Sequence, residues 1–249
     1  MFICLLFHRI VNSPTVRLRE VSKGFFEGSI KAIKKHSLPV NTLSNLWTGE
    51  KMEAVKYISL TFDDGWESDY TIALPFLVEH DMKATFFIVT DLIDRKNYLK
   101  ESWLREMSNC GMEIGSHTVS HPNLTKLSKK EIYEELYSSK CKLEDMTGNE
   151  IVSVAIPYGM YNSLILNIAK EAGYKLIATC CPWINKMDSN EFFRISINTR
   201  TTVEDFNRLL SFSYSYLSKL YFSYLLRAFL KRSIGIENYL RFRKWLIKV

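Results

Sequence analysis

Strand-like and helix-like segments alternate about seven times along residues 1–207. The strand-like segments are short apolar runs, such as residues 57–62 and 84–89. Helix-like segments carry end signals, as at Ser128, which begins a capping-box pattern with Glu131, and at Gly148, which ends the same helix. Such alternation predicts an α/β fold built from βα units around a parallel sheet, either open or closed into a barrel.

Charge separates the last part of the chain from the rest. The net charge is +6, but residues 208–249 contain nine Lys or Arg and one acidic residue, giving +8 and leaving −2 for residues 1–207. The sequence therefore predicts two domains, 1–207 and 208–249. Aromatic residues and cations interleave in 208–249, which favours a helical segment in peripheral contact with an anionic membrane. The alternative is terminal helices packed on the main domain with a solvated basic face. No nucleic-acid partner is expected, because no binding motif accompanies the charge.

Residues 1–7 are apolar but lack the basic start and length of a signal peptide. A transmembrane helix needs about 20 consecutive apolar residues, and the sequence contains no such run. We therefore expect a cytoplasmic protein, with the inner face of the membrane as the alternative. The odd number of cysteines, five, matches no zinc or disulfide framework.

Two adjacent carboxylates, Asp63 and Asp64, follow the strand-like run at residues 57–62. Like charges this close resist joint ionisation unless a cation lies beside them. Strand geometry would direct the two side chains to opposite sides, so that they could act differently. The alternative interpretation is an ordinary Asp-Gly turn at Asp64 and Gly65.

A second polar segment contains His117 and His121, two of the five histidines. Together with Asp64 they form a set of three ligands that leaves a position for water, which is typical of a catalytic zinc site. We expect a divalent metal, zinc first, with cobalt, nickel or iron as alternatives. Asp63 would then be a general base beside the metal. Taken alone, the two histidines would be ordinary polar loop residues.

Two motifs carry a family resemblance: Thr61-Phe62-Asp63-Asp64-Gly65 and His117-Thr118-Val119-Ser120-His121. They resemble the first two motifs of the polysaccharide deacetylases, the NodB-homology family of carbohydrate esterases. The resemblance implies a distorted (β/α)7 barrel, and the charge and composition of residues 208–249 predict a C-terminal helical basic extension. It also implies a metal held by Asp64, His117 and His121, with Asp63 as the catalytic base. Residues 156–159 resemble the third motif, in which Pro157 and Tyr158 would line the substrate groove and the Tyr158 N–H would bind the oxyanion.

Two departures from the family pattern stand out. Ala155 and Ile156 precede Pro157 where the family usually has an Arg that orients the base, and no histidine follows His121 to serve as the acid. The chain therefore resembles the permuted subgroup of poly-N-acetylglucosamine deacetylases, which implies that His8 is the general acid.

Two tryptophans, Trp66 and Trp183, lie near the motifs and could stack on a sugar ring, with core packing as the alternative.

The resemblance implies a metal-dependent hydrolase that removes N-acetyl groups from a sugar of a poly- or oligosaccharide or of a lipid-linked glycan, as in the synthesis of envelope polysaccharide. Two alternatives remain. One is a catalytically inactive carbohydrate-binding or scaffold module on the same fold, and the other is a de-O-acetylase.

Overall fold

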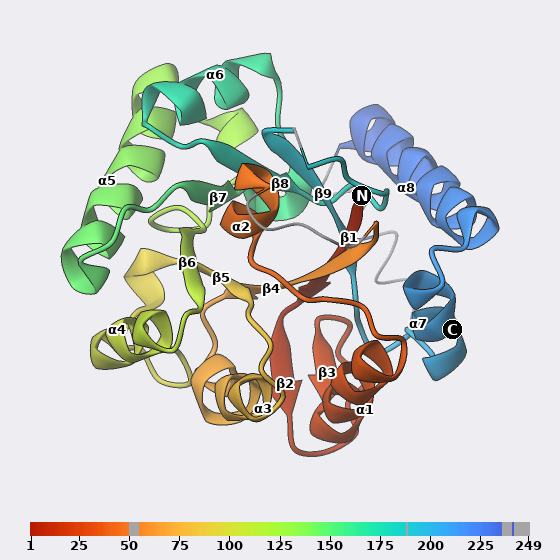
Figure 1. Ribbon diagram of the computed structural model, residues 1–249. Helices are drawn as coiled ribbons and strands as arrows, with labels where there is room; N and C mark the ends of the chain where they lie inside the picture. Colours follow the sequence, from red (N-terminus) through yellow and green to blue (C-terminus); the bar gives the residue numbers. More distant parts are fainter. Residues whose placement is uncertain (50–54, 188, 236–240, 242–249) are drawn as a thin grey trace.

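A closed barrel of seven parallel strands forms the centre of the protein, as seen in a computed structural model that describes residues 1–49, 55–187, 189–235 and 241 (Figure 1). Closure occurs between the first and last barrel strands, where Cys4 pairs with Arg194. The predicted α/β fold is confirmed, and the barrel is the closed form implied by the family resemblance. In pairing order the strands are β1 (Phe2–Phe7), β4 (Tyr57–Asp64), β5 (Thr85–Ile88), β6 (Glu113–Ser116), β7 (Ser153–Ala155), β8 (Leu176–Thr179) and β9 (Glu191–Ser196).

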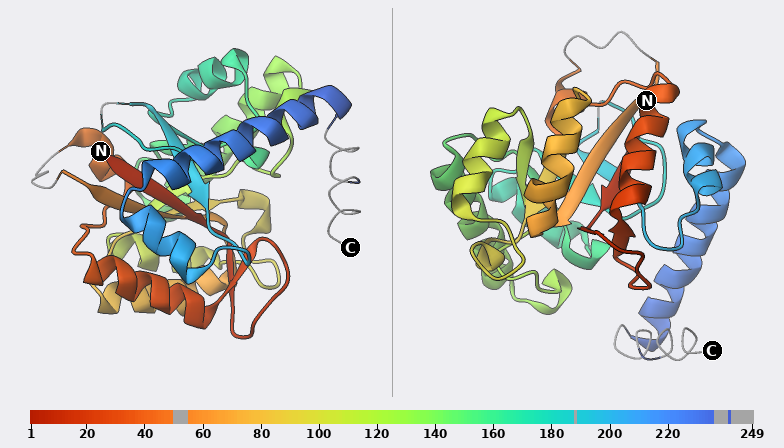
Figure 2. Two further views of the ribbon diagram at one scale, coloured as in Figure 1. Left: turned by 90° about the vertical axis from the view of Figure 1, so that its right-hand side faces the viewer. Right: turned by 90° about the horizontal axis from the view of Figure 1, so that it is seen from below.

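Helices surround the barrel, and β2 (Arg9–Val11) and β3 (Glu20–Ser22) form a separate two-stranded ribbon (Figures 1 and 2). The predicted capping box of Ser128 and Glu131 begins α5, and Gly148 ends it in the left-handed conformation. The outer helices are α1 (Lys23–Lys35), α3 (Leu74–Glu79), α4 (Glu101–Asn109), α5 (Lys129–Thr147), α6 (Ser163–Glu171), α7 (Val203–Leu210) and α8 (Tyr214–Ile234). Short 3-10 turns are η2 (Thr90–Leu92), η3 (Leu124–Lys126) and η4 (Pro157–Gly159).

Two segments differ from what their own sequences predict. Residues 41–52, with Gly49, have the pattern of a connection, but they contain α2 (Leu43–Thr48), whose N-cap Thr42 accepts a hydrogen bond from the Asn45 N–H. Residues 69–80 have the pattern of one helix with Pro75 near its start or at a kink. They form a π-helical turn, η1 (Asp69–Ala73), followed by α3. The change occurs just before Pro75, which has no N–H to donate and crowds the preceding turn.

Alternate residues of each strand pack on opposite sides of the barrel wall. In β1, Ile3, Leu5 and Phe7 belong to the large core between barrel and helices, while Phe2 and Cys4 belong to a smaller cluster with Leu43 and Leu46 of α2. The smaller cluster fills the barrel interior, and α2 covers one end of it.

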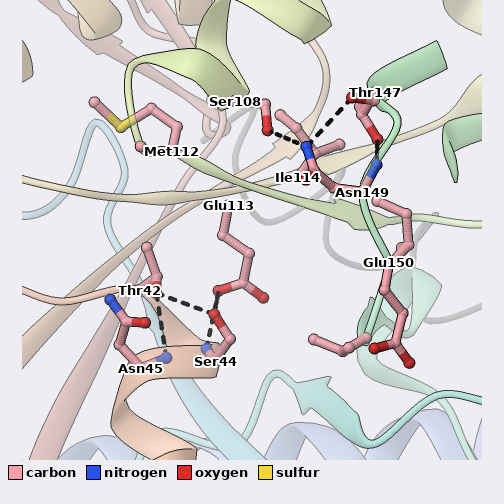
Figure 3. Close-up of a pocket in the computed structure, with 13 residues that line it drawn as sticks. Thr42, Ser44, Asn45, Ser108, Met112, Glu113, Ile114, Thr147, Asn149 and Glu150 are labelled. Carbon is pink, nitrogen blue, oxygen red and sulfur yellow. Dashed lines mark hydrogen bonds between the residues drawn. The ribbon is translucent and has the colours of Figure 1, made fainter. Parts of the chain in front are cut away.

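Glu113, at the start of β6, forms hydrogen bonds that connect α2 to neighbouring strands at this covered end (Figure 3). One of its carboxylate oxygens accepts hydrogen bonds from the Ser44 N–H at 2.9 Å and from the Thr85 hydroxyl at 2.9 Å. The other accepts from the Ser153 hydroxyl at 2.7 Å. A small cavity of about 210 Å³ lies beside these residues. The barrel is thus closed at the amino ends of its strands, which leaves the carboxyl ends for a functional site.

The predicted boundary at residue 207 lies inside α7. Phe206 of this helix packs edge-on against Phe25, with ring centroids 6.1 Å apart. Beyond the boundary, four side chains are buried in the large core: Leu209, Leu210, Phe212 and Leu217. The division into two domains stays a prediction.

Candidate active site

The polar residues singled out in the sequence gather at the carboxyl ends of the barrel strands. Asp63 and Asp64 end β4, and His117 directly follows β6. A cavity of about 1170 Å³ opens here, and its lining includes His8, Asp63, His117, His121 and Tyr158.

Three of these groups form a compact ligand set. The Nε2 atoms of His117 and His121 each lie 3.7 Å from the same oxygen, Oδ1 of Asp64. One ligand atom from each residue can be chosen so that all three lie within 4.8 Å of one another. The second oxygen of Asp64 accepts a hydrogen bond from the Trp66 indole at 3.3 Å.

The tautomer of His117 suits it to metal binding. Its Nδ1 lies 2.8 Å from the carbonyl oxygen of Ala155. A carbonyl only accepts hydrogen bonds, so Nδ1 carries the proton and Nε2 presents its lone pair to the ligand set. Burial, together with the neighbouring His117, lowers the pKa of His121 to about 4, which keeps the His121 imidazole neutral near pH 7. Two imidazole nitrogens and a carboxylate oxygen fit a divalent metal such as zinc.

The loop that carries His121 is held by a residue that the sequence did not reveal. Glu135 of α5 accepts hydrogen bonds from the backbone N–H groups of Val119 and Ser120, both at 2.9 Å. His121 itself has a left-handed backbone, with φ of 58°. Non-glycine residues rarely adopt this region unless surrounding contacts hold them there. Glu135 therefore acts on the site by fixing the path of this loop.

Asp63 forms a buried ion pair with Arg194 of β9. The guanidinium donates to both carboxylate oxygens, at 2.6 and 3.0 Å, and the two residues are only 2% and 1% exposed. Burial alone would raise the pKa of Asp63, but the charge and hydrogen bonds of Arg194, together with the neighbouring His117 and His8, outweigh it and lower that pKa to about 2. The Nε of Arg194 also donates to the carbonyl of Thr179 at 3.2 Å, which fixes the guanidinium.

Arg194 is a candidate for the base-orienting arginine that is missing before Pro157. The family pattern expects an arginine before Pro157, at the end of β7, and this chain instead has one on β9, two strands further along the barrel. The only local signal was a lone cation within an apolar strand, which is costly unless the cation is paired.

His8 lies directly after β1, beside Asp63. In the parallel pairing of β1 with β4, Phe7 is opposite Phe62, so the next residues of the two strands are neighbours. Burial lowers the pKa of His8 to about 4. The carboxylates of Asp63 and Asp64 raise this pKa, but burial has the larger effect. Its Nδ1 is buried without a hydrogen-bond partner among the described residues.

The third-motif segment forms one wall of the cavity. Tyr158 has a φ of 60°, and its ring packs edge-on against His121 with centroids 4.7 Å apart. Gly159 follows with a φ of 61°, and a Cβ there would lie 2.8 Å from Cβ of Cys180, so only glycine allows this close approach. The main chain is thereby drawn toward the ligand set.

Three residues expected to contact substrate do not line the cavity within the described part of the chain: Pro157, Trp66 and Trp183. Pro157 is buried. Trp66 stacks on Tyr98, with centroids 4.5 Å apart. Trp183 packs against Tyr221 of α8, at 5.3 Å. Contact of these residues with a sugar stays a prediction.

Comparison with known proteins agrees with this geometry. The family model described as polysaccharide deacetylase matches residues 50–177. The chain belongs to the polysaccharide deacetylase family. YxkH of Bacillus subtilis (strain 168), a protein named for the same family, is 30% identical over 191 residues, which cover 76% of this chain and 67% of YxkH.

Two further polysaccharide deacetylase relatives bear on the site. The poly-beta-1,6-N-acetyl-D-glucosamine N-deacetylase of Staphylococcus aureus (strain MRSA252) is 29% identical over 180 residues, covering 66% of this chain and 62% of that protein. The solved structure of the Streptococcus pyogenes deacetylase PplD in complex with acetate superposes with a TM-score of 0.74 and 28% identity, covering 82% of this chain and 95% of PplD.

Proposed function

We propose that this protein is a metal-dependent hydrolase that removes acetyl groups from the nitrogen of an N-acetylated sugar in a glycan. One observation supports the proposal above all. Asp63, held by Arg194, has a carboxylate oxygen 3.7 Å from Nε2 of His117, so a base lies directly beside the candidate ligand set. The names of the relatives support N-acetylated glycans as the substrate class.

Asp64, His117 and His121 would hold the metal ion, with zinc expected and cobalt, nickel or iron as alternatives. Such an ion, when bound, lowers the pKa of water to about 7 and polarises a carbonyl group.

Asp63 would accept the proton of the attacking water. Its lowered pKa keeps the carboxylate ionised near neutral pH, and its two hydrogen bonds to Arg194 fix its orientation. The backbone N–H of Tyr158 would donate to the oxyanion that forms on the acetamide.

His8 would donate the proton that the departing amine needs. This imidazole is neutral near pH 7, because burial lowers its pKa to about 4. It must therefore gain a proton while the acetamide is bound. The carboxylates of Asp63 and Asp64, which raise the pKa of His8, are the neighbours that favour this gain.

Two alternatives compete with this proposal: an inactive binding or scaffold module, and a de-O-acetylase. The buried Asp63–Arg194 pair beside a complete ligand set favours an active enzyme, because a buried ion pair is a weak source of stability by itself. Peripheral membrane contact through residues 208–249 stays a prediction.

Acetate release from N-acetylglucosamine oligosaccharides tests the proposal. We expect the purified chain to release acetate, a chelator to stop the release, and an added divalent metal to restore it. In Asp63→Asn, turnover should fall by about 10²–10⁴-fold, the usual range for loss of a general base. The variant should retain the metal content of the wild type, because Asp63 is outside the ligand set.

The control variants separate the roles of the histidines. His8→Ala should lose turnover while binding metal normally, whereas His36→Ala, outside the cavity, should behave as the wild type. Full turnover in Asp63→Asn would exclude the base assignment. Release from O-acetylated but not from N-acetylated glycans would favour the de-O-acetylase.

A further inference from the structure

Helix α8 presents apolar side chains on two opposite faces. Leu217 is fully buried, Leu220 packs on the core, and Tyr221 contacts Trp183. The opposite face carries side chains that are 74%, 43%, 56% and 65% exposed, in the order Phe222, Leu225, Leu226 and Phe229.

These four exposed residues follow the i, i+3, i+4, i+7 spacing and therefore form one continuous line along the helix, which we call the outer stripe. Single exposed apolar residues are common on soluble proteins, but a contiguous apolar patch usually marks an interaction site. In the views of Figures 1 and 2, α8 lies along the outside of the barrel.

The charge of the surrounding segment indicates what covers the outer stripe. The α8 sequence contains Lys219, Arg227, Lys231 and Arg232 and no acidic residue, within a segment of net charge +8. No helix in the described residues is both long and apolar enough to cross a bilayer. An apolar stripe on a helix rich in cations is the pattern of a helix lying in the interface of an anionic bilayer.

We propose that the outer stripe of α8 docks the protein onto an anionic membrane surface. Phe222 and Phe229 enter the boundary between head groups and acyl chains, and the net positive charge of the segment is attracted to the lipid phosphates. A second copy of this chain would cover the same stripe without lipid, and the experiment separates the two cases.

Docking in this way would bring the active-site cavity close to the lipid. Tyr224, Arg227 and Ala228 of the same helix line the cavity. The cavity is thus separated from the docked face by the thickness of one helix, about 10 Å. If the proposed deacetylase function holds, its substrate is a glycan held at the membrane surface, such as a lipid-linked saccharide.

Binding to lipid vesicles tests the docking without reference to activity. The full chain is sedimented with vesicles of phosphatidylcholine alone or mixed with phosphatidylglycerol. We expect binding to the mixed vesicles only, weakened by salt. The double variant Phe222→Ser, Phe229→Ser should bind at least tenfold more weakly. The matched control, Tyr137→Ser with Leu164→Ser, changes exposed apolar residues of α5 and α6 and should bind as the wild type.

Three results would overturn the proposal. The first is that the wild type does not bind the vesicles that contain phosphatidylglycerol. The second is that the stripe variant binds as tightly as the wild type, which would assign binding to other residues of 208–249. The third is that the lipid-free wild type is a dimer and the stripe variant a monomer, which would assign the stripe to a second copy.

An activity arm separates this inference from the proposed function. Acetate release is compared between an N-acetylglucosamine oligosaccharide anchored in the mixed vesicles and the same oligosaccharide free in solution. The stripe variant should lose activity on the anchored form and retain it on the free form. Equal loss on both forms would contradict the membrane role, whereas inactivity of the wild type on both, with intact vesicle binding, would contradict only the deacetylase proposal.

Discussion

At the scale of single residues, the ion pair between Asp63 and Arg194 decides both charge and stability in the active site. Both side chains are almost fully buried, so each is the counter-charge that the other needs. Breaking such a pair by removing one partner leaves an uncompensated charge in the interior, which typically costs 3–5 kcal/mol.

Arg194→Met should therefore lower the free energy of unfolding by about 3–5 kcal/mol, as measured by urea unfolding at pH 7. Without the guanidinium, the pKa of Asp63 should rise from its present value of about 2. A base works only when deprotonated, so the acidic limb of the kcat/KM profile should move to higher pH.

The exposed pair of Arg208 and Glu204 supplies the control. Arg208→Met should change stability by less than about 1 kcal/mol, because exposed ion pairs contribute little. If the two arginine variants lost equal stability, or if the pH profile of Arg194→Met did not move, the importance given to the buried pair would be wrong.

Individual residues differ in how far the sequence reveals them. Asp63 and Asp64 stand side by side, and His117 and His121 share one loop, so short motifs exposed the candidate ligands and base. Arg194 is 131 positions from Asp63, and only closure of the barrel brings the two together. No pattern of local spacing could have shown that pairing.

At the scale of elements, the π-helical turn η1 places a carboxyl group in an unusual environment. Asp69 is completely buried, and neither of its carboxyl oxygens makes a well-formed hydrogen bond to a described residue. Burial raises the pKa of Asp69 well above its ordinary value, and the charge of Asp64 adds to the effect.

This raised pKa predicts a pH dependence of stability. An Asp with a raised pKa in the folded state stabilises the fold below its unfolded pKa of about 4, and this contribution is lost as pH rises through the folded pKa. Urea unfolding of the chelator-treated protein should therefore show wild-type stability falling, relative to Asp69→Asn, as pH rises above about 4.

Asp145→Asn, a change at an exposed position of α5, provides the comparison and should show no such divergence. Parallel stability curves for the wild type and Asp69→Asn across this pH range would show that Asp69 has an ordinary pKa in the fold.

End signals revealed an element only where a long helical pattern accompanied them. The capping box and terminal glycine of α5 gave both ends of that helix. Helix α2 is only six residues long, which is too short for apolar periodicity to identify it. The π-turn η1 was hidden because its apolar residues also fit an α-helix, and only the position of Pro75 signalled a break.

At the scale of the whole molecule, the chain beyond residue 207 completes the core of the barrel. Four buried side chains, Leu209, Leu210, Phe212 and Leu217, would be lost in a chain ending at Asn207. Burial of each contributes about 1.5–3 kcal/mol. Their sum is comparable to the whole stability of a typical domain, about 5–15 kcal/mol.

We therefore expect the chain ending at Asn207 to be largely unfolded, as judged by circular dichroism and thermal melting. A chain ending at Ser223 keeps all four side chains and should melt cooperatively. Cooperative melting of the shorter chain near the wild-type temperature would support an independent domain 1–207 instead.

The closed barrel shows where sequence patterns stop being informative at this scale. Alternation of strands and helices predicted parallel βα units but left an open sheet and a barrel equally compatible. The decision depends on whether β1 pairs with β9, a contact between the two ends of the domain. Only the family resemblance favoured the closed form.

The position of Arg194 on the last barrel strand has a consequence for how the protein is made. During synthesis Asp63 leaves the ribosome long before Arg194 does, and until β9 inserts between β1 and β8 the carboxylate lacks the guanidinium that pairs with it. A nascent chain therefore has its candidate ligands early, but the proposed base is not held in a fixed orientation until the ring closes. Catalytic competence would appear at a late stage of maturation, so partly made chains in the cell would be inert toward acetylated sugars.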